Sequence, residues 1–153
     1  MYSNINTKNL YFVSPKKDIS ILYPRIPDSR ELFENDNIKR ICFSNNIDKC
    51  IIATTQHHLK KKLYIYNIKY VLRDNKLVKR SLGVSNKNII KNKLVDDAHL
   101  TNEIWVCEPV ILNIVGEIKL DRRKIITIKS NIFNNRRDEE LIINIPKYKI
   151  TLY

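Results

Sequence analysis

The sequence predicts a strand-rich α+β fold in a single domain that spans residues 1–153. Three observations support this prediction. The length is that of one ordinary domain. Short apolar or alternating segments recur along the chain, as strands do, and only one segment shows clear helical periodicity over about three turns. No repeat, linker or low-complexity segment divides the chain, so one hydrophobic core is expected.

The expected strands are apolar or alternating segments bounded by turn residues. The longest signal is Lys62–Leu72, in which Tyr64, Tyr66 and Tyr70 fall on one face. Two strong strand signals meet at Pro109, which is expected to mark a bulge or bend in one continuous element. The other expected strands are Asn9–Ser14, Lys39–Phe43, Glu103–Cys107 and Val110–Leu120, with up to three more at Lys124–Lys129, Leu141–Ile145 and Tyr148–Leu152.

Two helices are expected. Asp28–Asn37 begins with good capping residues and predicts a short helix. Ser44 is the expected cap of a second, amphipathic helix, in which Ile47, Cys50, Ile51 and Thr54 fall on one face at helical spacing. The polar, weakly periodic stretch 73–93 predicts a long surface loop with at most one short strand.

The composition excludes several classes of protein. Gly83 and Gly116 are the two glycines of the chain, so a P-loop and a GxGxxG nucleotide site are both excluded. Cys42, Cys50 and Cys107 are odd in number and lie in apolar runs, which argues against a disulfide framework and against a zinc or other metal site. The sequence shows neither a signal-peptide pattern nor a long apolar run, so we expect a cytoplasmic protein with no membrane partner.

Three segments resemble a known family. LYFVS, RICFSNNIDKCIIA and TNEIWVCEPV follow one another in the order of the three sequence blocks of the ADP-ribosyltransferase superfamily, in the branch of the poly(ADP-ribose) polymerases. The family blocks read approximately L-[WF]-H-G-[ST], I-Y-F-A followed by a helix, and N-E-Y-[IV]-V-Y. The third block is the sharpest match, through Asn102, Glu103 and Val106.

The resemblance implies a fold, a substrate and a catalytic residue. The implied fold has two packed, mainly antiparallel β-sheets around a cleft, with about two helices. NAD is the implied substrate, without a metal, and a protein or nucleic acid is the implied acceptor of ADP-ribose. Glu103 matches the family's catalytic glutamate, which stabilises an oxocarbenium-like transition state. The alternative for Glu103 is an ordinary solvated residue at a strand end.

The first two blocks depart from the family pattern. Phe12 stands where the family has a histidine that bonds NAD, whereas Ser14 matches the pattern. Cys42 stands at the family's tyrosine, followed by the matching Phe43 and by Ser44 in place of alanine. These departures put catalysis in question, so a catalytically degenerate relative is an alternative.

Other side chains are candidates for the missing functions. Tyr11 and Ser44 are expected near the nicotinamide, and Arg25, between two prolines, near the phosphates of NAD. His99 precedes Glu103 by four residues and could replace the missing imidazole. The alternative for His99 is a surface histidine paired with a neighbouring aspartate. The alternative for Arg25 is a solvated arginine.

Two other functional classes fit the sequence. The net charge of +12 and the basic region Lys60–Lys93, interleaved with tyrosines, are typical of a nucleic-acid-binding module that stacks bases on exposed rings. Against it, the tyrosines share a face with Ile68, which favours core packing. A third class is a toxin, antitoxin or phage-encoded inhibitor that acts only through protein contact.

Overall fold

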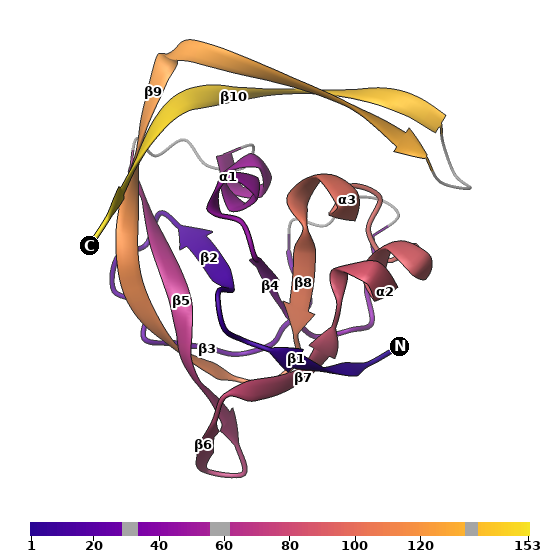
Figure 1. Ribbon diagram of the computed structural model, residues 1–153, viewed down its shortest axis with the longest axis vertical. Coiled ribbons are helices and arrows are strands. Elements are labelled where there is room, and N and C mark those ends of the chain that lie inside the picture. Colours follow the sequence, from indigo (N-terminus) through magenta and orange to yellow (C-terminus); the bar gives the residue numbers. More distant parts are fainter. Residues whose placement is uncertain (29–33, 56–61, 134–137) are drawn as a thin grey trace.

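The computed structural model describes residues 1–28, 34–55, 62–133 and 138–153. Within these residues the strands form one antiparallel, ten-stranded sheet, accompanied by three short helices (Figure 1). The expected α+β fold with two packed sheets was therefore wrong. Alternation along a strand shows that it has two different faces, but not which strand it pairs with, so one curved sheet and two packed sheets give the same sequence pattern.

The order of strands across the sheet is β1-β7-β8-β4-β2-β5-β9-β10, with β3 paired to β9 and β6 paired to β5. The strands are β1 (Ser3–Asn6), β2 (Tyr11–Ser14), β3 (Ile21–Leu22), β4 (Ile41–Ser44), β5 (Lys62–Arg73), β6 (Lys76–Val78), β7 (Arg80–Val84), β8 (Glu103–Val106), β9 (Val110–Phe133) and β10 (Asp138–Leu152). The helices are α1 (Ile47–Thr55), α2 (Asn86–Lys91) and α3 (Ala98–Thr101).

Several sequence predictions are confirmed at the level of single elements. Strands β2, β4, β5 and β8 lie where the sequence predicts them, and α1 follows β4 as expected. The four expected strands after Pro109 form two, β9 and β10, which pair along the whole of β10. The expected continuous element across Pro109 was wrong, because β8 and β9 are separate strands with different neighbours in the sheet. The helix expected over Asp28–Asn37 falls largely on residues 29–33, which lie outside the described residues.

The prediction of a surface loop over residues 73–93 was wrong, because this stretch contains the strands β6 and β7 and the helix α2. Strand β7 lies between β1 and β8, where Gly83 pairs with Ser3 on one side and Val106 on the other. A Cβ atom at Gly83 would collide with the carbonyl oxygen of Trp105 and with Ile5. Glycine is therefore required for this close packing, and the polar residues at the start of β7 and around it hide the strand from the sequence pattern.

The core lies on both faces of the central strands. One face is packed by apolar side chains that include Phe43, Tyr66 and Val106. On the other face, α1 packs on β2 and β5 through Cys50 and Ile51, whereas Trp105 joins α2 and α3 in a separate cluster. Register shifts between β5 and β9 bend the sheet, and Figure 1 shows its curvature.

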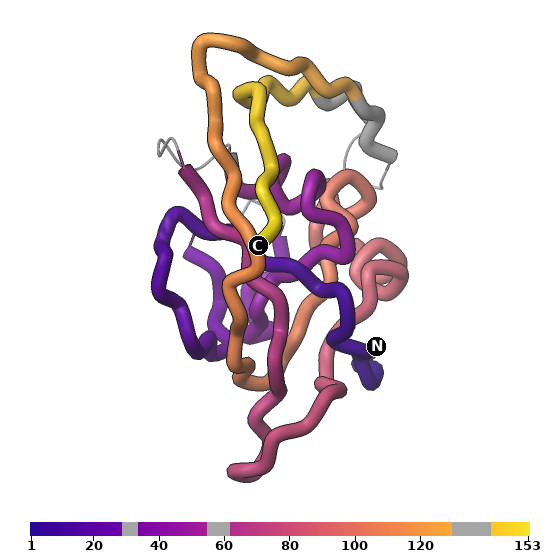
Figure 2. Tube along the Cα trace, turned by 60° about the vertical axis from the view of Figure 1, so that its left-hand side comes forward, coloured from indigo at the N-terminus to yellow at the C-terminus, as the bar shows by residue number. Residues whose placement is uncertain are grey.

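The outer halves of β9 and β10 leave the sheet as a two-stranded arm that crosses over α1 (Figure 2). Ile143 and Ile145 of the arm are buried against Ile52 of α1, with Leu100 of α3 beside them. The hydroxyl of Tyr148 donates a hydrogen bond to the carboxylate of Asp48 at 2.6 Å. Among the described residues, no helix has the length and apolar character needed to cross a membrane.

Candidate functional site

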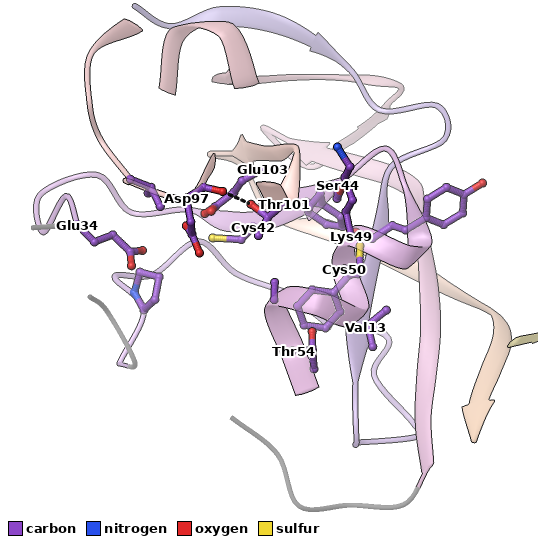
Figure 3. Close-up of a pocket in the computed structure, with 16 residues that line it drawn as sticks. Val13, Glu34, Cys42, Ser44, Lys49, Cys50, Thr54, Asp97, Thr101 and Glu103 are labelled. Atoms are coloured by element: carbon purple, nitrogen blue, oxygen red, sulfur yellow. Dashed lines mark hydrogen bonds between the residues drawn. The ribbon is translucent and has the colours of Figure 1, made fainter. Parts of the chain in front are cut away.

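A cavity of about 250 Å³ lies between α1 and the strands β2, β4 and β8 (Figure 3). It is lined by the strands, by α1, by the end of α3 and the residues that precede this helix, and by the segment that leads into β4. The lining residues are Tyr11, Phe12, Val13, Pro27, Glu34, Cys42, Phe43, Ser44, Lys49, Cys50, Ala53, Thr54, Val95, Asp97, Thr101 and Glu103.

The floor of the cavity is a row of residues across three neighbouring strands. Ser44 of β4 is paired with Tyr11 of β2 on one side and with Glu103 of β8 on the other. Directly paired residues of antiparallel strands point to the same face of a sheet. Tyr11, Ser44 and Glu103 therefore point to the face that α1 covers, although they come from three distant parts of the chain.

Helix α1 forms the second wall. It begins after Asn46, whose side-chain oxygen accepts a hydrogen bond from the backbone N–H of Lys49 at 3.1 Å. Asn46 is therefore the capping residue, and the expectation that Ser44 caps the helix was wrong by two residues. The Ser44 hydroxyl accepts instead from the backbone N–H of Asn46 at 3.3 Å. This contact links the pocket floor to the start of the helix.

Glu103 is placed by the turn that precedes it. Asn102 ends α3 in the left-handed conformation, with φ 51°, and β8 begins at the next residue. Asparagine tolerates this conformation better than most residues. The side-chain amide of Asn86 donates hydrogen bonds to the carbonyl oxygens of Ala98 and Glu103, both at 2.9 Å. The start of β8 is thus tied to both short helices.

The carboxylate of Glu103 is partly buried and hydrogen-bonded. The indole N–H of Trp105 donates to its Oε1 at 2.7 Å, and the thiol of Cys42 is a second donor. Burial raises the pKa of Glu103 above its ordinary value, although both donors act in the opposite direction. Burial and the nearby Glu103 carboxylate raise the pKa of Cys42 well above the usual value of a thiol.

Carboxylates gather at the end of the cavity near Glu103. Figure 3 shows Asp97 and Cys42 beside Glu103, with Glu34 on the same side. The charges of Glu34 and Asp97 contribute to the raised pKa of Glu103. Lys49 lines the other side, where its ammonium group donates to Asn102 at 3.0 Å. This end of the cavity is therefore acidic in a basic protein, which favours a ligand group that is cationic or becomes cationic.

The structure brings together five of the eight site residues expected from the sequence, because Tyr11, Phe12, Phe43, Ser44 and Glu103 all line the cavity. The rings of Phe12 and Phe43, however, contact each other with centroids 6.1 Å apart and belong to the core on the opposite face. Neither ring is thus a platform on the helix-covered face, where Tyr11 is the aromatic lining residue of β2.

The other three expected residues do not line the cavity. The Ser14 hydroxyl accepts a hydrogen bond from the backbone N–H of Lys16 at the end of β2. Arg25 has a side chain that is 73% exposed and forms an ion pair with Asp28 at 3.3 Å. His99 is exposed on α3.

Sequence reasoning missed several residues around the cavity. Cys50 and Thr54 lie four residues apart on α1, so the helical period that predicts this helix also places both on one face. The sequence alone therefore places these two residues on the same side of the helix. Glu34 and Asp97, by contrast, reach the cavity from distant segments, and their approach to Glu103 depends on the tertiary fold.

The tyrosines of the basic region are buried or half-buried in the part of it that the structure describes, which leaves out Lys60 and Lys61. Tyr66 is 1% exposed. The Tyr70 ring lies under the ammonium groups of Lys69 and Lys79, 5.9 and 4.2 Å from its centroid. A stacking surface for bases needs open rings, so the nucleic-acid hypothesis gains no support from this strand.

Comparisons with known proteins give no assignment: no family model, curated protein or solved structure matches the chain. Among the residues that the structure describes, no group of three or more histidine, cysteine, aspartate or glutamate side chains is arranged to hold a metal ion.

Proposed function

We propose that the protein binds the nicotinamide end of NAD in this cavity and transfers ADP-ribose to a macromolecular acceptor, with Glu103 as the catalytic carboxylate. One observation carries the proposal. The three sequence blocks that resemble the ADP-ribosyltransferase superfamily form the neighbouring strands β2, β4 and β8, and the row Tyr11–Ser44–Glu103 across them lines one cavity.

The chemistry requires a carboxylate at this place. When the bond between C1′ of the ribose and the nicotinamide nitrogen breaks, the electron pair leaves with nicotinamide and positive charge develops on the ribose. A fixed carboxylate in a site of low dielectric stabilises that charge more than water does. Glu103 would also accept a hydrogen bond from the 2′-hydroxyl. An acceptor nucleophile then forms the new bond to C1′.

The size and charge of the cavity limit what enters it. Sites that enclose a whole drug-sized ligand have volumes of about 300–1,000 Å³, and this cavity has about 250 Å³. It suits nicotinamide and its ribose, whereas the anionic diphosphate would lie outside the acidic end. Arg25, two residues before the lining residue Pro27, is our candidate for contact with the diphosphate.

The experiment is calorimetric titration of the protein with NAD, together with an assay of nicotinamide release, for the wild type and for Glu103→Gln. The matched control is Glu117→Gln, because Glu117 forms a partly exposed ion pair with Lys62 and does not line the cavity. We expect Glu103→Gln to lower nicotinamide release by about a hundredfold or more while NAD binding persists. The control should retain wild-type release.

Three outcomes separate the alternatives. Equal loss of release in both variants would contradict a specific role of Glu103. Binding without release in the wild type would identify a catalytically degenerate site, in agreement with Phe12 and Cys42 at family positions. No binding at millimolar NAD would refute the proposal, and salt-dependent binding of single-stranded nucleic acid would then be the next measurement.

A further inference from the structure

The orientation of the Glu103 carboxylate is set by its own strand and the next one. Glu103 and Trp105 are two residues apart on β8, so their side chains lie on one face, and Trp105 is paired with Cys42 of β4. The indole N–H can only donate a hydrogen bond, and it reaches Oε1 of Glu103 at 2.7 Å. The Cys42 thiol donates from the neighbouring strand.

We infer that Trp105 is a positioning residue, which acts with Cys42 to fix the Glu103 carboxylate at the cavity wall and to favour its charged form. Both groups are donors in these contacts, and a hydrogen bond to a charged acceptor stabilises the charged form over the neutral one. The contribution of Trp105 to turnover depends on the proposed function. Its effect on the carboxylate is a property of the fold alone.

Trp105 is itself held in place. Its side chain is 0% exposed, and the guanidinium carbon of Arg40 lies 4.0 Å from the centroid of its ring. Arg40 forms a 2.6 Å ion pair with Glu34 and donates to the backbone carbonyls of Asn35 and Ile38. A cation over an indole ring attracts electron density and so strengthens the positive end of its N–H bond. The stack thus makes Trp105 both immobile and a better donor.

Two acidic groups near Glu103 act against its charged form. Asp97, at the start of α3, and Glu34, before β4, are both anionic neighbours. Lys49 of α1 lines the cavity but donates to Asn102. Burial also opposes the charged form. The two donors are therefore the groups that offset burial and repulsion, and their removal is expected to raise the pKa of Glu103 further.

The first test uses the indole N–H of Trp105 as a reporter, because Trp105 is the one tryptophan in the sequence. Its N–H resonance is followed by nitrogen–proton NMR during a pH titration of the wild type, of Glu103→Gln and of the control Glu117→Gln. We expect the resonance to shift with the ionisation of a single group in the wild type and in the control. We expect that shift to disappear in Glu103→Gln.

The second test measures the pH dependence of nicotinamide release in Trp105→Phe, in Cys42→Ala and in Cys42→Ser. Loss of a hydrogen bond to a charged group should move the acid limb of the profile to higher pH by about one unit in Trp105→Phe. Cys42→Ala should move it in the same direction, and Cys42→Ser, which keeps a donor, should return it towards the wild-type position.

The two tests fail in different ways. An indole resonance that does not respond to pH, or that responds equally in Glu103→Gln, would overturn the positioning role whatever the activity of the protein. An indole titration that depends on Glu103 supports the role even in a protein that releases no nicotinamide, where the proposed function alone would fail. The NMR test remains decisive if Trp105→Phe does not fold, because it requires no substitution of the indole.

Discussion

The two faces of strands β2, β4 and β8 differ in what they contact. On one face, Phe12, Phe43 and their neighbours pack against other strands in a closed apolar cluster, and Phe43 is 2% exposed. On the other face, Tyr11, Ser44 and Glu103 meet a helix and leave a cavity of about 250 Å³. The same short strands therefore supply a packed core and an open, acidic pocket.

The two faces differ because different elements cover them. Neighbouring strands of the curved sheet bring apolar side chains together without a gap, whereas α1 is nine residues long and covers only part of its face. Residues that alternate along one strand thus have different surroundings, because one packs in the core and the next faces the cavity. Substitutions on the two faces should have different effects on stability.

The largest effect is expected on the core face, from Phe43→Ala. This change removes a buried ring that contacts Phe12 at 6.1 Å between centroids, and it should lower the free energy of unfolding by about 3–5 kcal/mol. Denaturant unfolding followed by circular dichroism measures the change. The matched substitution on the pocket face is Ser44→Ala, for which we expect about 1 kcal/mol. Equal losses for both residues would contradict the distinction between the faces.

An intermediate effect is expected where the covering helix begins. Asn46→Ala removes the side-chain oxygen that accepts from the N–H of Lys49, and loss of such a cap costs about 1 kcal/mol. Because α1 forms one wall of the cavity, we also expect weaker NAD binding at unchanged pH, measured by calorimetry. Asn46→Asp keeps the capping oxygen and is the control. Wild-type stability in Asn46→Ala would show that the helix start is held by other contacts.

Local patterns predicted the strands that build the pocket. Alternation of apolar residues predicted β2, β4, β5 and β8, and helical spacing after Ser44 predicted α1. Sequence blocks selected Tyr11, Ser44 and Glu103, which the register of the sheet places in one row. The strands and the helix depend on residues close together in sequence, where the periods of strand and helix are informative.

Features that depend on contacts between distant segments could not be predicted from local sequence patterns. The order of strands, and hence one curved sheet in place of two, depends on pairing between distant segments. Strand β7 contains Gly83 and is flanked by polar residues, so its pattern resembles a loop although it lies between two strands of the sheet. The contact of Trp105 with Glu103 needed only the alternation of one strand, but the stacking of Arg40 on that indole required the fold.

The smallest effect, and one of opposite sign, is expected for Glu103→Gln. Burial raises the pKa of Glu103 in the folded protein above its usual 4.5, so the folded state holds this proton more tightly than the unfolded chain does. The stability that this carboxyl group contributes is complete below pH 4.5 and is lost as the pH rises through the higher folded value. At neutral pH, the charged side chain therefore costs stability.

Glutamine removes the buried charge, while its amide oxygen can still accept from Trp105. We expect Glu103→Gln to be as stable as the wild type or more stable at neutral pH, with a difference that shrinks as the pH falls towards 4.5. Thermal or denaturant unfolding of both proteins across this range measures it. A variant less stable than the wild type at neutral pH would show that Glu103 serves the fold. A gain in stability together with a loss of nicotinamide release would mark it as a residue retained for function.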